Sequence, residues 1–282
     1  MLYIGAAFAL LAVIILWYFG VFKRQKASSE GDGPEGGVDL SRQLIQAKGA
    51  LSETMLNRLN DYGIQQVPEA IELWPRIAPE IKKELVDFWE SQGFIKDYVS
   101  DLGTKDEGKR AEAARILISL KEKRIIPLLV DALSQPEKYL PARVAEVLAA
   151  FGTDTVDYLS GMLFDLPDKT KTLAIDILQE IADDRAVVPL IKELAAESPE
   201  IRQKAVSALG EIGNPKALEN LINLMGDAEW KVRSMTARAL GQLGCPEAIP
   251  VLQKALNDEA WWVRVNARDA LDKLTVNEEK HA

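Results

Sequence analysis

The most constraining feature of this sequence is a segment near its C-terminal end that occurs twice in tandem. The tetrapeptide WKVR at 230–233 returns 31 residues later as WWVR at 261–264. The same step carries Pro215 onto Pro246 and Leu240 onto Leu271. Self-similarity at a period of roughly 20–50 residues is typical of proteins built from stacked repeats. Each repeat buries its apolar face only against its neighbours, so we expect a row of repeats rather than one central core.

The repeat continues towards the N-terminus as two rows of apolar residues. The first row steps by 30 or 31 residues: Leu117, Leu148, Leu178, Leu209, Leu240 and Leu271. The second follows three residues later: Leu120, Phe151, Ile181, Ile212, Leu243 and Leu274. The i, i+3 spacing places both rows on one face of a helix, and no strand-like alternation of useful length occurs. The pattern predicts an all-α array over residues 94–276, with about six pairs of helices, A then B.

Glycine follows the second apolar row in three repeats, at Gly152, Gly213 and Gly244. A helix commonly ends on a residue in the left-handed conformation, which glycine adopts without steric cost. These glycines therefore predict where three of the B helices end.

The last repeat, PEAIPVLQKALNDEAWWVRVNARDALDKL at 246–274, resembles a HEAT repeat of the short bacterial type also seen in phycobilin-lyase-like proteins. The likeness lies in Ala-Ile-Pro-x-Leu in helix A, an Asp before the turn, then Val-Arg and Ala-Leu-x-x-Leu in helix B. The resemblance is strongest from Ala186 to Leu274 and fades towards Phe94. It implies a right-handed α-solenoid with the B helices on its concave side, and HEAT-like arrays most often bind proteins.

An acidic residue stands six residues before a basic one in successive repeats, as in the pairs Asp227/Arg233 and Asp258/Arg264. Asp165 and Lys171 keep the same spacing. The HEAT resemblance implies a ladder in which each arginine binds acids of its own and of the adjacent repeat. Charge-assisted hydrogen bonds of this kind are directional and would fix the stacking register. We interpret these residues as structural.

The N-terminal segment predicts a membrane anchor. Residues 2–22 form an uncharged, mostly apolar run whose helical length, at ~1.5 Å per residue, matches a bilayer core of ~30 Å. Lys23, Arg24 and Lys26 follow directly, which places the N-terminus outside and the repeats in the cytoplasm by the positive-inside rule. The alternative is a cleaved signal peptide and a secreted array, but no basic n-region precedes the run and no small-x-small cleavage site follows it.

The remaining segments divide by composition. Residues 23–38 contain a basic flank and a Gly-rich flexible linker, and residues 277–282 are expected to be a disordered tail. Residues 39–93 do not follow the repeat clearly, and we interpret them as a divergent helical cap at the N-terminal end of the array. Apolar spacing there predicts one helix from about Asp39 to Asn60, then shorter helices at 67–74 and 81–89.

The sequence has few residues suited to catalysis or metal binding. The chain has one histidine, His281, and one cysteine, Cys245, so no paired His-Glu iron motif of the kind used by one HEAT-like enzyme family can be drawn. No Gly-rich phosphate loop is present. The sequence therefore predicts no catalytic, cofactor or metal site. The formal charge is −9, and the predicted concave row has mixed charges (Asp176, Ser207, Arg238 and Asp269), which argues against a nucleic-acid partner.

A protein-docking surface is the remaining candidate site. Trp230, Trp261 and Trp262 fall at the turns between A and B helices, and Arg238 lies further along a B helix. Repeated aromatic residues on one edge of a solenoid suit a binding hot spot, although each Trp could instead be buried between helices. The sequence as a whole predicts a membrane-tethered cytoplasmic scaffold or adaptor that binds a membrane-associated protein and has no catalysis of its own. The alternative is a bilin-lyase-like enzyme subunit or a regulatory subunit of a membrane complex.

Overall fold

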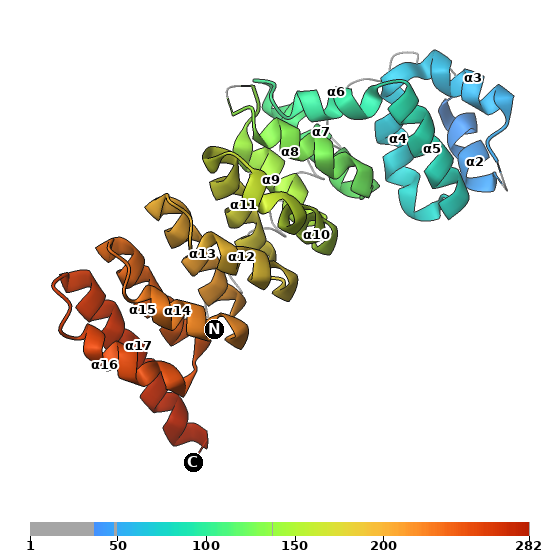
Figure 1. Cartoon of the computed structure of the whole chain (residues 1–282). Helices are drawn as coiled ribbons and strands as arrows, with labels where there is room; N and C mark the ends of the chain where they lie inside the picture. The colour runs from blue at the N-terminus through green and yellow to red at the C-terminus, as the bar shows by residue number, and fades with distance from the viewer. Residues whose placement is uncertain (1–36, 48–49, 137, 282) are drawn as a thin grey trace. The chain divides into compact units, whose positions relative to one another are not determined.

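The computed structural model describes residues 37–47, 50–136 and 138–281, and the regular secondary structure in these ranges is helical throughout (Figure 1). The predicted anchor at 2–22 and most of the predicted linker lie outside the described residues. None of the helices that are described is both long enough and apolar enough to span a bilayer. The chain divides into two compact units, Met1–Glu84 and Leu85–Ala282, with the division inside one helix.

The first compact unit contains α2 (Gly37–Gln46), α3 (Glu53–Tyr62), α4 (Gln66–Leu73) and the start of α5 (Pro79–Ser91). The predicted single helix over 39–60 is therefore two helices. The physical reason is a start signal inside the segment: the Ser52 hydroxyl accepts a hydrogen bond from the Met55 N–H at 3.3 Å and caps α3. Leu59 and Ile81 are fully buried in this unit.

The second compact unit contains a succession of helix pairs (Figure 1). Within its described residues the A helices are α6 (Phe94–Asp101), α8 (Ile126–Leu133), α10 (Thr153–Met162), α12 (Val187–Glu193), α14 (Leu218–Leu224) and α16 (Ile249–Ala255). The B helices are α7 (Glu107–Leu120), α9 (Pro141–Ala150), α11 (Asp168–Ile181), α13 (Pro199–Ile212), α15 (Trp230–Leu243) and α17 (Trp261–His281). Each A helix contacts the B helix that follows it, and each B helix contacts the next B helix. Helix α17 continues through most of the predicted C-terminal tail.

The first row of leucines forms the core between these pairs. Its first five members have no exposed surface: Leu117, Leu148, Leu178, Leu209 and Leu240. The second row is less uniform, because Phe151 and Leu274 are buried whereas Ile212 and Leu243 keep part of their surface exposed. Burial of one leucine per repeat stabilises the fold by about 2 kcal/mol each.

The B helices approach closely where a glycine of one helix faces an alanine of the next. A Cβ atom placed on Gly210 in α13 would lie 2.8 Å from the Ala239 Cβ in α15. A Cβ atom on Gly241 in α15 would lie 2.7 Å from the Ala270 Cβ in α17. Real Cβ contacts are not this short, so these two positions allow the B helices to pack at a distance that any larger residue would prevent.

The ends of the B helices partly follow the glycine prediction. Gly213 and Gly244 adopt the left-handed conformation with φ 71° and cap α13 and α15. Gly152 is different: its φ of 59° and ψ of −125° lie outside the left-handed helical region, and the cap of α9 is Phe151. Helix α9 thus ends next to Gly152 as predicted, but Gly152 does not adopt the left-handed helical conformation. Lys121 and Ala182 occupy the left-handed cap position without glycine, with φ 50° and 52°.

Candidate protein-docking site

A row of basic side chains lies near the start of the B helices, and three of them, Lys171, Arg202 and Arg233, also contact the following repeat. Each donates a hydrogen bond to a backbone carbonyl six or seven residues earlier in its own repeat, and the donors are Arg110, Lys171, Arg202, Arg233 and Arg264. For Arg233 the acceptor is the carbonyl of Asp227, at 2.8 Å from Nη1. For Arg264 it is the carbonyl of Asp258, at 2.7 Å. This bond ties the start of the B helix to the turn before it.

The other side of the guanidinium binds a carboxylate of the following repeat. Arg233 donates from Nε and Nη2 to the two carboxylate oxygens of Asp258, at 2.8 and 2.9 Å. Arg202 binds Asp227 in the same two-point geometry, at 2.7 and 2.9 Å. These are buried or largely buried side chains, and two-point arginine–carboxylate pairs are strong and directional. They set the register between successive B helices.

The electrostatics of the two aspartates follow from this geometry. Hydrogen bonds from Arg233 hold the pKa of Asp258 below its ordinary value. For Asp227, burial by itself favours the neutral acid, but the hydrogen bonds from Arg202 and from the Glu229 N–H outweigh it and lower the pKa. Both carboxylates are therefore held in the charged form that the ladder needs.

The ladder differs from the sequence prediction in its own-repeat contact. The aspartate six residues before each arginine offers its backbone carbonyl to that arginine, while its carboxylate binds the arginine of the preceding repeat. The spacing of six is therefore not itself an ion pair. Lys171 also departs from the predicted pairing with Asp165, because its Nζ binds the Glu193 carboxylate at 3.1 Å. Ala196 stands where later repeats have aspartate, and the nearby Glu193 supplies the acid instead.

Arg202 is a ladder residue that the sequence reasoning missed. The spacing of six between acid and base does not identify it, because Ala196 occupies the position of the acid. Its backbone carbonyl nevertheless accepts from Arg202 at 2.9 Å, since every residue type has a carbonyl. The signal that identifies Arg202 is its distance of one period from Arg233.

The three predicted docking tryptophans come together on the surface at the start of α15 and α17. Trp230 is 38% exposed, Trp261 57% and Trp262 53%. The rings of Trp261 and Trp262 pack edge to face, with centroids 4.5 Å apart and planes at 70°. A small apolar hollow is lined by these three rings and by Ala260. The interpretation in which each tryptophan is buried between helices does not describe these side chains.

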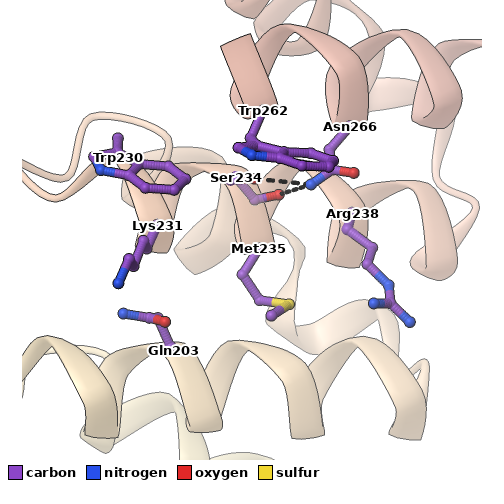
Figure 2. Close-up of a pocket in the computed structure, with 8 residues that line it drawn as sticks. All are labelled: Gln203, Trp230, Lys231, Ser234, Met235, Arg238, Trp262 and Asn266. Carbon is purple, nitrogen blue, oxygen red and sulfur yellow. Dashed lines mark hydrogen bonds between the residues drawn. The ribbon is translucent and has the colours of Figure 1, made fainter. Parts of the chain in front are cut away.

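A larger open pocket continues from the tryptophans across α13, α15 and α17 (Figure 2). Its volume is about 360 Å³, and we call it the tryptophan pocket, lined by Gln203, Trp230, Lys231, Ser234, Met235, Arg238, Trp262 and Asn266. The Asn266 amide donates to the Ser234 hydroxyl at 2.8 Å and to its carbonyl oxygen at 3.1 Å, which fixes one wall (Figure 2). The pocket thus brings Arg238 together with Trp230 and Trp262, whereas Trp261 lies in the adjoining hollow.

Comparison with known families identifies the repeat. Residues 159–229 and 218–281 match the family model for HEAT repeats. Residues 159–281 are HEAT repeats. Residues 109–135 match the PBS lyase HEAT-like repeat. These matches lie in the second compact unit, where the helix pairs stack as an α-solenoid. No curated protein matches the chain significantly.

Several solved structures resemble this chain. The CpcE–CpcF complex of phycocyanin lyase from Nostoc sp. PCC7120 is 25% identical, with 53% of this chain and 99% of that chain covered and a TM-score of 0.48. Human deoxyhypusine hydroxylase is 19% identical over 86% of this chain and 96% of that chain, with a TM-score of 0.40. A designed armadillo repeat protein in complex with the peptide (KR)4 is 18% identical over 86% and 100%, with a TM-score of 0.37.

Metal and thiol chemistry can be assessed in the described residues. In the described part of the chain no group of three or more His, Cys, Asp or Glu side chains is arranged to hold a metal ion. Cys245 precedes α16 and is partly buried, and this burial raises the pKa of its thiol, which disfavours the reactive thiolate. The tryptophan pocket is instead a surface of aromatic, amide and basic groups, which suits non-covalent binding.

Proposed function

We propose that this chain is a HEAT-repeat scaffold that binds a protein partner through the tryptophan pocket and the adjoining hollow. The observation that supports this proposal most is the exposure of Trp230, Trp261 and Trp262 on neighbouring helix ends. Tryptophan is usually largely buried, and three exposed rings on one surface form a binding hot spot of the kind found at protein interfaces. The finer features of the array, its right-handed twist and a binding face formed by the B helices, belong to the same proposal.

Alanine substitution of two tryptophans tests the docking site. The double variant Trp230→Ala/Trp262→Ala removes exposed rings, so the helices should remain intact while binding weakens strongly, by about 2 kcal/mol or more for a hot-spot residue. Partners are first captured by cross-linking and mass spectrometry in native membranes, and recovery by each variant is then compared. Phe164→Ala is the matched control, since Phe164 is 72% exposed and lies outside the pocket. Equal recovery by wild type and the double variant, with unchanged circular dichroism, would dismiss this site.

The proposal includes tethering to the cell membrane. It is supported by the uncharged run at residues 2–22 and by the basic residues that follow it. A tether would confine the array near membrane proteins and raise its effective concentration towards them. Carbonate extraction of membranes is the test: an anchored chain stays in the pellet, and intact-mass measurement of the purified protein begins at Met1. Release into the supernatant, or a mass that lacks the first residues, would contradict the tether.

A second candidate is a bilin-lyase-like subunit, favoured by the PBS lyase HEAT-like repeat at residues 109–135. It predicts that a coloured small molecule accompanies the protein through purification from its native source. An absorption spectrum without visible bands would count against this candidate and leave the docking proposal unaffected.

A further inference from the structure

The tryptophan pocket has a chemical bias that narrows the class of partner. Its two charged side chains, Lys231 and Arg238, are both basic, and no carboxylate lines it within the described residues. The whole chain has a formal charge of −9, so a pocket with only positive charge is a local exception. Building on the docking function proposed above, we infer that the tryptophan pocket binds an acidic peptide segment of the partner, with an apolar side chain held among Trp230, Met235 and Trp262.

The two cations are available to a ligand because the protein does not neutralise them. Other basic residues on the same helices are committed: Arg233 binds Asp258, and Arg202 binds Asp227. Lys231 lies over the Trp230 ring at 5.8 Å, and Arg238 is exposed; neither has an ion pair among the described residues. A partner carboxylate would therefore gain attraction without breaking an existing bond.

One acid of the row predicted from the sequence is neutralised within the protein. Asp176 on α11 is bound by Lys204 of α13, whose Nζ lies 2.5 and 2.7 Å from the two carboxylate oxygens. Asp269 on α17 lies one period after Arg238 and is exposed, but it is not among the residues that line the pocket. Of the four residues in that row, Asp176, Ser207, Arg238 and Asp269, only Arg238 lines the pocket.

The spacing of the cations sets the spacing of the acids. Lys231 and Arg238 are seven residues apart on α15, which is two helical turns or roughly 10 Å along the axis. Figure 2 shows them on opposite sides of Met235. An extended, polyproline-like chain advances about 3.1 Å per residue and repeats its facing every third residue, so acids at i and i+3 span about 9 Å on one side. The favoured ligand is therefore acidic-x-x-acidic, with an apolar residue between the two acids.

Selection from a random-peptide display library tests this inference directly. The full chain in detergent is the target, and the Trp230→Ala/Trp262→Ala variant removes peptides that bind elsewhere. We expect the wild-type-specific peptides to carry net negative charge, an apolar residue, and acids three positions apart. Neutral or basic peptides, acids seven apart as on a docked helix, or no wild-type-specific enrichment would each overturn the inference.

The best selected peptide is then synthesised and its affinity measured by fluorescence anisotropy. Lys231→Gln/Arg238→Gln should weaken binding about five- to tenfold and reduce its dependence on salt, as expected for two exposed charges. Lys216→Gln, an exposed lysine outside the pocket, is the matched control and should change nothing. Stronger competition by single-stranded oligouridine than by the peptide would assign the pocket to nucleic acid and overturn the inference.

The outcomes separate this inference from the proposed function. If a cross-linked protein partner depends on Trp230 and Trp262 but not on Lys231 and Arg238, the docking function stands and the acidic peptide is wrong. If the tryptophans have no effect on partner recovery, the docking function itself fails.

Discussion

Asp258 shows how one side chain joins two repeats. Its carboxylate accepts two hydrogen bonds from Arg233 of the preceding repeat, and one of the same oxygens accepts from the Ala260 N–H at 2.9 Å. Its backbone carbonyl accepts from Arg264 of its own repeat. The residue therefore holds the turn before α17 and the neighbouring helix α15 at the same time.

The ladder predicts acid sensitivity that depends on Asp258. Because the folded pKa lies below the ordinary value of 3.8, this group stabilises the fold fully above that value and loses the contribution as the pH falls through the depressed pKa. We expect Asp258→Asn to lower the free energy of unfolding by about 2 kcal/mol at neutral pH. The variant should also show a shallower loss of stability below about pH 4.

Urea denaturation followed at a series of pH values measures both effects. Asp157→Asn is the control, because the Asp157 side chain is 58% exposed and its pair with Arg185 lies on the surface. Equal acid limbs for wild type and Asp258→Asn would contradict the ladder as a source of stability.

The left-handed helix ends predict opposite effects at equivalent positions. Ala182 ends α11 with φ 52°, a conformation that costs a residue with a Cβ atom about 1 kcal/mol. Ala182→Gly relieves this cost but adds freedom to the unfolded chain, so we expect a net gain of about 0.5 kcal/mol. Gly213→Ala, at the same position of the next repeat, should lose about 1 kcal/mol. Thermal unfolding of both variants measures these changes in stability, and two changes of the same sign would contradict the prediction.

The conformation and exposure of single residues are the hardest properties to predict from this sequence. Periodicity places Trp230 and Trp262 at the starts of helices, but it does not show whether their side chains are buried or exposed to solvent. Lys121 and Ala182 adopt the left-handed conformation although neither is glycine, so their residue types give no sign of the helix ends. Arg202 is visible only through the period, since its own flanking sequence lacks the expected acid.

At the scale of helices, the distance between neighbouring B helices depends on glycines, which have no side chain. Gly241→Ala places a Cβ atom 2.7 Å from the Ala270 Cβ, so we expect α15 and α17 to separate and stability to fall by about 1 to 3 kcal/mol. The loss should appear even though alanine favours helix by about 1 kcal/mol over glycine. Gly161→Ala in α10 is the matched control, because nothing lies within 4 Å of its added Cβ, and it should be neutral or stabilising. Chemical denaturation of both variants measures the difference, and a stabilised Gly241→Ala would show that the helices do not touch there.

Helix existence follows from the sequence more readily than helix boundaries. One leucine per repeat is enough to place every B helix, because burial between neighbours is the main source of stability for such helices. The break between α2 and α3 was missed since the apolar spacing continues across it, and the Ser52 cap competes successfully with that spacing. The extension of α17 to His281 was missed because its last residues are polar and carry no periodic signal.

For the array as a whole, contacts between neighbouring repeats predict graded rather than all-or-none behaviour. A chain that ends at Gly244 lacks α16 and α17, and with them the Asp258 carboxylate that Arg233 binds. We expect the remaining repeats of the second compact unit to stay helical, with hydrogen exchange faster in α15 and unchanged in α7. Circular dichroism and exchange mass spectrometry test this. Loss of the helical signal throughout the chain would mean that the repeats fold as one body.

The two complete ladder contacts have nearly the same geometry: Arg202 meets Asp227 at 2.7 and 2.9 Å, and Arg233 meets Asp258 at 2.8 and 2.9 Å. Because the same arginine–aspartate contact joins both pairs of repeats, one repeat could replace the other at either junction. A duplicate of residues 215–245 inserted after residue 245 would carry its own Asp227 and Arg233. Its aspartate would bind the arginine of the preceding repeat, and its arginine would bind Asp258 of the following repeat. Unequal crossing-over within the gene, or deliberate splicing, could therefore lengthen the protein by whole 31-residue modules while preserving every joint.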